Sequence, residues 1–147
     1  MVFAAISLAG KSEIIVCKKG FKINSETYIE ILQSILIPFI EKFHKDDYFV
    51  LQDNARSHIS KKTFNWIKEK QLKMIENYPP YSPDFNAIEG VWKILKDSVE
   101  KMQPSNLELL EESIKIAWKE ITQPTIWSLI EHAHNNLKEC IKNNGLN

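Results

Sequence analysis

The stretch that decides the fold is Tyr48-Phe49-Val50-Leu51-Gln52-Asp53-Asn54, an apolar run that ends in a carboxylate. A second carboxylate, Glu89, follows the proline-rich residues 79–83 and opens an amphipathic helix. The apolar run predicts a buried strand, and α/β proteins place ligand sites at the carboxyl ends of such strands. Mg²⁺ accepts one or two carboxylates, keeps several waters and takes its other ligands from substrate phosphate. The two acids therefore predict a divalent-cation site near phosphate oxygens.

The composition indicates a single globular domain without a global charge signal. The chain has 147 residues, of which 44% are apolar and 26% charged, and is long enough to bury a core. Its 19 basic residues balance its 19 acidic residues, so binding to a polyanion would need a local patch. Arg56 is the only arginine, which excludes arginine clamps elsewhere in the sequence.

Three features of the sequence bear on the compartment. Cys17 and Cys140 are isolated, which predicts free thiols in a reducing environment. The apolar residues 2–8 lack a preceding basic region and are too short to span a membrane. We therefore expect an intracellular protein that is not secreted and has no membrane partner.

Hydrophobic periodicity predicts alternating strands and helices in the first half of the chain. Residues 2–8 and 13–18 are typical of a β-hairpin around a turn that contains Gly10. Asn24 or Ser25 is expected to cap a helix that runs to residue 43, with a kink or reset at Pro38. Strands are expected at 48–52 and 72–75. Between them, a helix at 59–70 should turn Phe64 and Ile67 inward.

The second half is predicted to be helical after one irregular stretch. Residues 78–83 hold three prolines, which fix their own φ angles and remove backbone donors, so regular structure is not expected there. Apolar residues then recur at helical spacing over 88–102, 107–121 and 126–141. This order of strands and helices belongs to the α/β class.

Each candidate site residue also has a purely structural interpretation. Asp53 or Asn54 would cap the next helix equally well. If Asn86 is an N-cap, Glu89 stands at the third helical position, where it would complete a capping box. His58 is interpreted as a hydrogen-bonded structural group, with metal ligation or proton transfer as the alternative. From spacing alone these alternatives stay open.

Two lysines share the helical face of Glu89. At 100° per residue, Lys93 and Lys96 lie within about 40° of Glu89 on the helix. We interpret Lys93 as an i,i+4 ion-pair partner of Glu89. Lys96 stays open between a solvated surface charge and a phosphate contact.

Two motifs taken together resemble a known family. They are Asp53-Asn54-Ala55-Arg56-Ser57-His58 and Tyr81-Ser82-Pro83-Asp84-Phe85-Asn86-Ala87-Ile88-Glu89-Gly90-Val91-Trp92-Lys93-Ile94-Leu95-Lys96. They are similar to the mariner-type cut-and-paste transposases and, more exactly, to the catalytic domain of the DDE superfamily endonucleases. Two segments upstream, residues 2–10 and 21–28, also sit where that family has them, so the resemblance covers nearly the whole chain. It favours the functional interpretation of Asp53 and Glu89 over the structural one.

The resemblance implies a fold, a cofactor and a partner. The fold would be ribonuclease-H-like, as in retroviral integrases, with extra C-terminal helices. Three acids would bind two Mg²⁺ or Mn²⁺ ions, with Asp53 as the second acid and Glu89 as the third. The partners would be DNA, both transposon ends and target, and a second copy of the chain in a homodimer. The protein would be nuclear in a eukaryote and otherwise cytoplasmic. The candidate DNA contacts are Asn54, His58, Lys61, Lys62 and Lys96.

The sequence departs from the family pattern at three places. Ala87 stands where the family usually has proline, and Gly90 replaces a more usual polar residue, which should lower helix stability by up to about 1 kcal/mol. The family's first aspartate lies on an earlier strand, and no acid precedes Glu13 here.

The missing first acid sets the activity that we expect. We expect residues 1–147 to be one N-terminally truncated catalytic domain that lacks the first strand and is inactive alone. The alternatives are a fragment of a longer active enzyme, or a non-catalytic DNA- or protein-binding remnant of a transposase.

Overall fold

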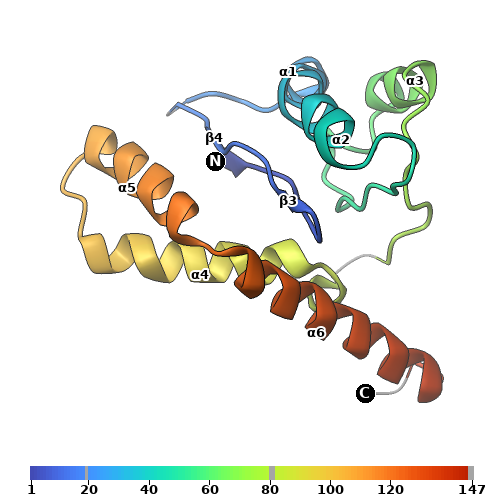
Figure 1. Cartoon of the computed structure of the whole chain (residues 1–147). Coiled ribbons are helices and arrows are strands. Elements are labelled where there is room, and N and C mark those ends of the chain that lie inside the picture. The colour runs from blue at the N-terminus through green and yellow to red at the C-terminus, as the bar shows by residue number, and fades with distance from the viewer. Residues whose placement is uncertain (19, 80–81, 146–147) are drawn as a thin grey trace.

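The computed structural model describes residues 1–18, 20–79 and 82–145. Helices dominate it, and short strands are confined to the N-terminal region (Figure 1). The elements are β1 (Val2–Phe3), β2 (Ile6–Ser7), β3 (Gly10–Lys11), β4 (Ile15–Val16), α1 (Ser25–Ile31), the π-helix η1 (Leu32–Leu36), α2 (Ile37–Phe43), α3 (Lys61–Glu69), the 3₁₀ turn η2 (Pro83–Phe85), α4 (Ala87–Met102), α5 (Leu107–Glu120) and α6 (Gln123–Lys142).

The expected N-terminal hairpin is present, but it is broken into two strand pairs. β1 pairs with β4, and β2 pairs with β3, both antiparallel. Between the pairs, the Ala5 N–H donates to Ser12 Oγ over 2.8 Å, and the Ser12 N–H donates to the Ala5 carbonyl over 2.8 Å. A side-chain hydroxyl replaces a ladder carbonyl at this point, so the prediction of a continuous strand over residues 2–8 is wrong.

The strands expected at 48–52 and 72–75 shrink to one parallel bridge between Val50 and Met74. The Val50 N–H donates to the Lys73 carbonyl over 2.8 Å, and the Ile75 N–H donates to the Val50 carbonyl over 2.9 Å. Both predicted strands are therefore too long. So short a pair is marginal without further strands beside it, and in the described residues neither segment pairs with a third strand.

The helix predicted from Asn24 onward is confirmed, with the reset that Pro38 predicted. The Asn24 side chain accepts a hydrogen bond from the Thr27 N–H and caps α1. A π-helical turn, η1, then separates α1 from α2, and Pro38 lies in the first turn of α2. A proline in this position lacks the N–H that a continuous α-helix would need, and a π-bulge is a common accommodation.

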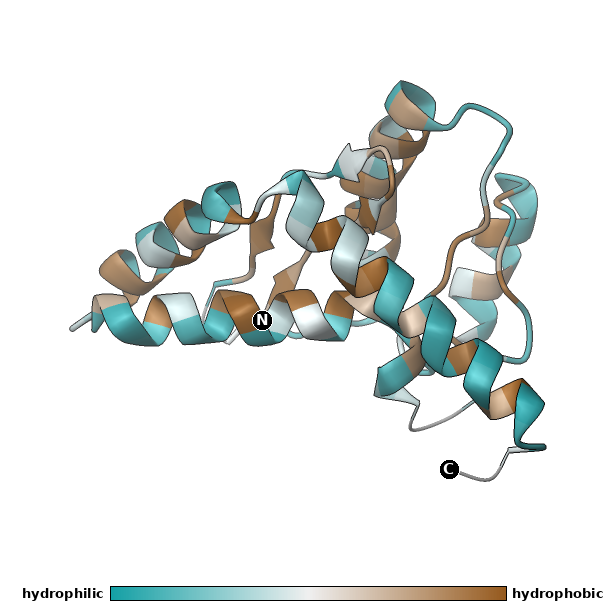
Figure 2. Cartoon of the chain, turned by 60° about the horizontal axis from the view of Figure 1, so that its bottom comes forward, coloured by the Kyte–Doolittle hydropathy of each residue, from teal (hydrophilic) through white to brown (hydrophobic). Residues whose placement is uncertain are grey.

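Two hydrophobic clusters form the core, one on each side of the hairpin. The first joins α1, η1 and α2 through Tyr28, Leu32, Leu36 and Ile40. The second joins α4, α5 and α6 with the hairpin and includes the fully buried Val91 and Ile126. Figure 2 shows apolar positions interleaved with polar ones along α4, α5 and α6, as expected for helices that bury one face.

The hairpin is joined to the end of α5 by Lys11 and Trp118. Lys11 Nζ donates to the carbonyl oxygens of Trp118, Lys119 and Ile121. The indole N–H of Trp118 donates to the Ser12 carbonyl over 2.9 Å. A lysine in this position satisfies carbonyls that the end of the helix leaves without partners.

The helix expected at 59–70 is α3, and one of its two inward residues was assigned wrongly. Ile67 is buried, at 8% exposure, whereas Phe64 is 63% exposed. The residue that takes the inward place is Thr63, which is fully buried and donates through Oγ1 to the Ser57 carbonyl over 2.6 Å. Thr63, with its hydroxyl hydrogen-bonded, thus takes the inward place that the apolar pattern assigned to Phe64.

Two expectations about the whole chain can be compared with the described residues. None of the described helices combines the length and the apolar composition that crossing a bilayer requires. Cys17 and Cys140 are free thiols, as predicted.

Gly90 lets α4 approach α6 closely. A Cβ atom at Gly90 would lie 2.6 Å from Leu129 Cδ2, which is too close unless the leucine side chain moves. The low helix propensity of glycine is therefore accompanied by closer packing between two helices.

We predict that Gly90→Ala stabilises the fold more in a Leu129→Ala background than in the natural one. With Leu129 truncated, the gain in helix propensity should approach about 1 kcal/mol. With Leu129 intact, the displaced methyl group should reduce that gain by about 0.5 kcal/mol or more. Urea unfolding of the four proteins measures the difference. Equal gains in both backgrounds would show that the two helices are not in contact at this point.

Candidate functional site

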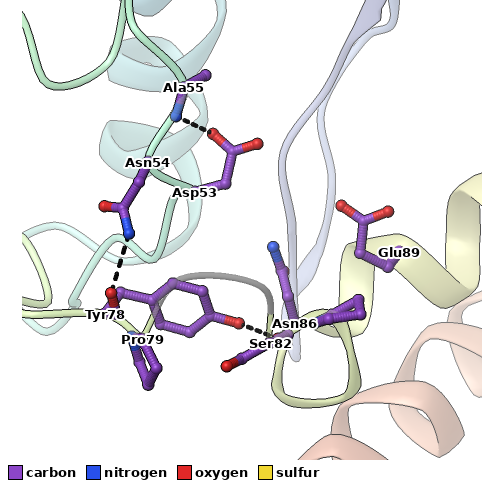
Figure 3. Close-up of a pocket in the computed structure, with 9 residues that line it drawn as sticks. Asp53, Asn54, Ala55, Tyr78, Pro79, Ser82, Asn86 and Glu89 are labelled. Carbon is purple, nitrogen blue, oxygen red and sulfur yellow. Dashed lines mark hydrogen bonds between the residues drawn. The ribbon is translucent and has the colours of Figure 1, made fainter.

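Asp53 and Glu89 line the same cleft, which lies between the loop after Val50 and the start of α4 (Figure 3). Its volume is about 350 Å³. The lining residues are Asp53, Asn54, Ala55, Tyr78, Pro79, Ser82, Pro83, Asn86 and Glu89. Two acids that are distant in sequence therefore share one solvent-accessible space, as the sequence predicted.

Asp53 is held by its loop and does not cap a helix. Its carboxylate oxygen Oδ1 accepts a hydrogen bond from the Ala55 N–H over 3.0 Å and contacts His58 Nδ1 at 2.6 Å. The side chain of Asp53 is 58% exposed, so it remains accessible from the cleft. The cap of α3 is Ser60, whose Oγ accepts from the Thr63 N–H over 3.1 Å. The capping interpretation of Asp53 and Asn54 is therefore wrong.

His58 lies against the core and not at the cleft surface. Its ring stacks on Tyr28 with 4.0 Å between ring centroids and 27° between ring planes. The Tyr28 hydroxyl donates to Gln52 Oε1 over 2.6 Å, next to Asp53 in sequence. Burial raises the pKa of Tyr28 above its usual range, and the charge of Asp53 raises it further. Tyr28 thus stays a neutral donor, and His58 is the hydrogen-bonded structural group that the sequence favoured.

Glu89 lies in the first turn of α4, and its carboxylate is exposed. Asn86 is the N-cap of α4, but its side chain makes no capping hydrogen bond. The Glu89 N–H bonds to the Asn86 carbonyl instead, over 3.0 Å. The reciprocal side-chain bonds of a capping box are therefore not formed. Within the described residues Glu89 also forms no ion pair with Lys93, so that interpretation of Lys93 is not supported.

The loop between the two acids is fastened at three points. The Asn54 side-chain amide donates to the Tyr78 carbonyl over 3.0 Å, and the Tyr78 hydroxyl donates to the Ser82 carbonyl over 2.5 Å. The Asn136 amide, from α6, donates to the Asp84 carbonyl over 3.2 Å. These bonds join the loop to Asn54, next to Asp53, and to α6.

The irregular stretch predicted over 78–83 includes Pro80 and Tyr81, which lie outside the described residues. At its end, Pro83 begins the 3₁₀ turn η2, so the prediction that this stretch holds no regular structure is wrong at that residue. Proline suits the first position of such a turn because its missing N–H would have no partner there.

Tyr78 is the cleft residue that sequence reasoning missed. It is half-buried, and its pKa is raised first by burial and then by the charges of Glu89, Asp53 and Asp84. A tyrosine before two prolines gives no local signal of this role, because the acids around it come from other segments.

The candidate DNA contacts are scattered around the site. Lys62 forms an ion pair with Glu26 at 2.5 Å, and Lys96 lies 3.9 Å from Glu100, both on exposed surface. Lys61 is exposed at the first position of α3. Asn54 is the only one of the five candidates among the residues that line the cleft, and its amide holds Tyr78.

The donor set fits a hard divalent cation that brings further ligands of its own. Asp53 and Glu89 supply carboxylate oxygens, which Mg²⁺ and Mn²⁺ prefer, and the cleft leaves room for water and phosphate oxygens. Across residues 1–18, 20–79 and 82–145, no three His, Cys, Asp or Glu side chains gather closely enough to hold a metal by themselves. The two acids are thus a partial ligand set.

Solved structures with the same fold include those of the Mos1 transposase. The chain superposes on the Mos1 strand transfer complex with a TM-score of 0.78 over 99% of its length, at 17% identity, and covers 43% of that chain. It matches the Mos1 transposase catalytic domain solved with Mg with a TM-score of 0.77, also over 99% of its length and at 17% identity, covering 75% of that chain. These matches confirm the ribonuclease-H-like α/β fold.

The sequence is similar to nematode transposases. It is 32% identical to the transposable element Tc3 transposase of Caenorhabditis elegans over 99% of this chain and 44% of the relative. It is 27% identical to the Tcb1 transposase of Caenorhabditis briggsae over 80% of this chain and 43% of the relative. The chain thus spans less than half the length of these relatives. The family model for the DDE superfamily endonuclease matches residues 1–111. The chain therefore belongs to the DDE superfamily endonucleases, as its resemblance to mariner-type transposases predicted.

Proposed function

We propose that Asp53 and Glu89 are two metal-binding carboxylates of a catalytic centre that cuts and joins DNA strands in cut-and-paste transposition. The observation that carries this proposal is their convergence on one cleft from two different segments. Membership of the DDE superfamily endonucleases supports it, as does the similarity to transposases over nearly the whole chain.

The proposed cofactor is Mg²⁺ or Mn²⁺, two ions in a complete site. The Mos1 catalytic domain has been solved with Mg and with Mn, which supports either ion for a related site. When bound, such ions activate water or a DNA 3′-hydroxyl as the nucleophile and stabilise the leaving oxygen. Asp53 and Glu89 would hold the ions. The hydrogen bonds of Tyr78 to Asn54 and Ser82 would keep the two acids at a fixed separation.

DNA is the proposed partner, as transposon ends and as target. Its phosphate oxygens would complete the coordination that two carboxylates leave open. Because the net charge is zero, the phosphate contacts would have to come from local lysines, of which Lys61 is the candidate at the start of α3. A homodimer and, in a eukaryote, a nuclear location are part of the same proposal.

The isolated 147-residue chain is proposed to be inactive. Two carboxylates leave a two-metal site short of ligands, and the described residues offer no third close enough to share a metal with them. The proposal therefore separates metal and DNA binding, which this chain should retain in part, from strand cleavage.

We predict that Asp53→Asn and Glu89→Gln each weaken Mn²⁺ binding roughly tenfold or more, because each removes one anionic ligand and keeps the side-chain shape. Titration followed by electron paramagnetic resonance measures free Mn²⁺ directly. Asp84→Asn is the matched control, because Asp84 is an exposed neighbour that does not line the cleft. An equal loss in the control would reduce the effect to general surface charge.

Cleavage of a terminal-repeat DNA by the 147-residue chain should be absent in Mn²⁺, because the ligand set is incomplete. Gel analysis of end-labelled DNA measures it. Robust cutting would contradict the proposed inactivity. If DNA binding occurs and is unchanged by Asp53→Ala and Glu89→Ala, while charge reversal of Lys61, Lys62 and Lys68 abolishes it, the chain is a non-catalytic DNA-binding remnant.

The pKa of Tyr78 should fall in Glu89→Gln and in Asp53→Asn, because removing a nearby negative charge favours the phenolate. Tyrosinate absorbance against pH measures this, with Tyr78→Phe subtracted to isolate the residue. Asp84→Asn should have the smallest effect of the three. An unchanged Tyr78 pKa in Glu89→Gln would place Glu89 away from this cleft.

A further inference from the structure

We propose that His58 is a positioning residue for Asp53, which holds the carboxylate oxygen Oδ1 and leaves Oδ2 to face the metal. The inference rests on the proposed function, since it describes how one of the proposed ligands is oriented. It assigns His58 a place behind the ligand, and neither in contact with DNA nor on the metal itself.

Only one of the two carboxylate oxygens of Asp53 is hydrogen-bonded within the described part of the chain. Oδ1 contacts His58 Nδ1 at 2.6 Å and accepts from the Ala55 N–H over 3.0 Å. An ionised carboxylate oxygen can only accept, so Nδ1 must carry the proton of the shorter contact. Oδ1 therefore accepts from two donors. Oδ2 has no hydrogen bond within the described part of the chain, which makes it the oxygen available to a cation.

His58 is rigid because it is tied to the core at several atoms. Its side chain is only 19% exposed, and one face of the ring lies on Tyr28, which is itself buried. Its backbone N–H donates to the Ala55 carbonyl over 2.8 Å, within the same loop as Asp53. Tyr28 also fixes the residue before Asp53 through the bond to Gln52. An exposed aspartate on a loop is thus oriented by an imidazole that cannot rotate freely.

The same geometry argues against the two other roles of His58. The Nδ1 atom is committed to Asp53, and the other ring nitrogen, Nε2, lies on the far side of the ring, out of reach of a cation held by Asp53 Oδ2. One face of the ring is covered by Tyr28, and the side chain is only 19% exposed, so little of it is left to stack on a base. In many metal sites a carboxylate orients a metal-ligating histidine. Here the order is reversed, and the histidine orients the ligating carboxylate.

Two substitutions separate the hydrogen bond from the stacking. His58→Phe keeps a flat ring of similar size on Tyr28 and removes the Nδ1 donor. His58→Asn removes the ring but places an amide N–H close to the former position of Nδ1. Mn²⁺ affinity of the full chain is measured for both by electron paramagnetic resonance, together with Asp53→Asn, and circular dichroism checks that each variant is folded.

The expected result is that His58→Phe weakens Mn²⁺ binding roughly tenfold, as is typical when the support of a metal ligand is lost. His58→Asn should bind within about threefold of the natural chain, because the donor is retained. The combination of His58→Phe with Asp53→Asn should bind no worse than Asp53→Asn alone, because His58 acts only through Asp53.

Three results would overturn the inference. Natural Mn²⁺ affinity in His58→Phe would show that the donor is not needed. An equal loss in His58→Asn and His58→Phe would show that a donor near the position of Nδ1 is not what supports Mn²⁺ binding. A further loss on adding His58→Phe to Asp53→Asn would place His58 on the metal. If Asp53→Asn itself binds Mn²⁺ normally, the proposed function fails and the inference fails with it. If Asp53→Asn weakens Mn²⁺ binding and His58→Phe does not, the inference alone is overturned.

If His58→Phe does not fold, the decision rests on His58→Asn, which is expected to keep Mn²⁺ binding. A folded His58→Asn that loses it more than tenfold contradicts the role of the donor.

Discussion

Tyr28 is buried beneath the loop that carries Asp53, and its contacts fix the residues on either side of that aspartate. Its hydroxyl binds Gln52, and its ring supports His58, whose Nδ1 reaches the carboxylate. A polar loop near solvent would otherwise leave Asp53 free to rotate, because the adjoining strand is reduced to one bridge at Val50. The position of Asp53 thus depends on a tyrosine in the hydrophobic core.

The position of Glu89 depends on a different part of the molecule. Glu89 stands on the first turn of α4, which packs on α6 at Gly90 and belongs to the second hydrophobic cluster. The hairpin packs on the first cluster through Phe3 and Ala5 and is bonded to the end of α5 through Lys11 and Trp118. The cleft lies between the loop that carries Asp53 and the start of α4, and Tyr78, whose hydroxyl donates to the Ser82 carbonyl, also lines it. Each carboxylate therefore has its own rigid support, as two ligands of one cation require.

Local patterns predict the parts of this protein that depend on nearby residues. The helix capped by Asn24 and the reset at Pro38 follow from short-range signals, and the structure confirms them. The position of each acid relative to its element suggested a shared cation site, and the resemblance to a known family favoured it over the capping interpretation. Contacts between distant segments were not predictable in the same way: the stacking of His58 on Tyr28 joins residues 30 positions apart, and Phe64 lost its inward place to a threonine.

The central claim is that Asp53 and Glu89 hold the same divalent cation. Anomalous scattering from crystals soaked in Mn²⁺, with a terminal-repeat DNA present, locates the ion directly. The account predicts an anomalous peak in the cleft, coordinated by Oδ2 of Asp53 and by the carboxylate of Glu89, with His58 still bonded to Oδ1. A peak bound to only one of these acids, or to neither, would contradict the claim.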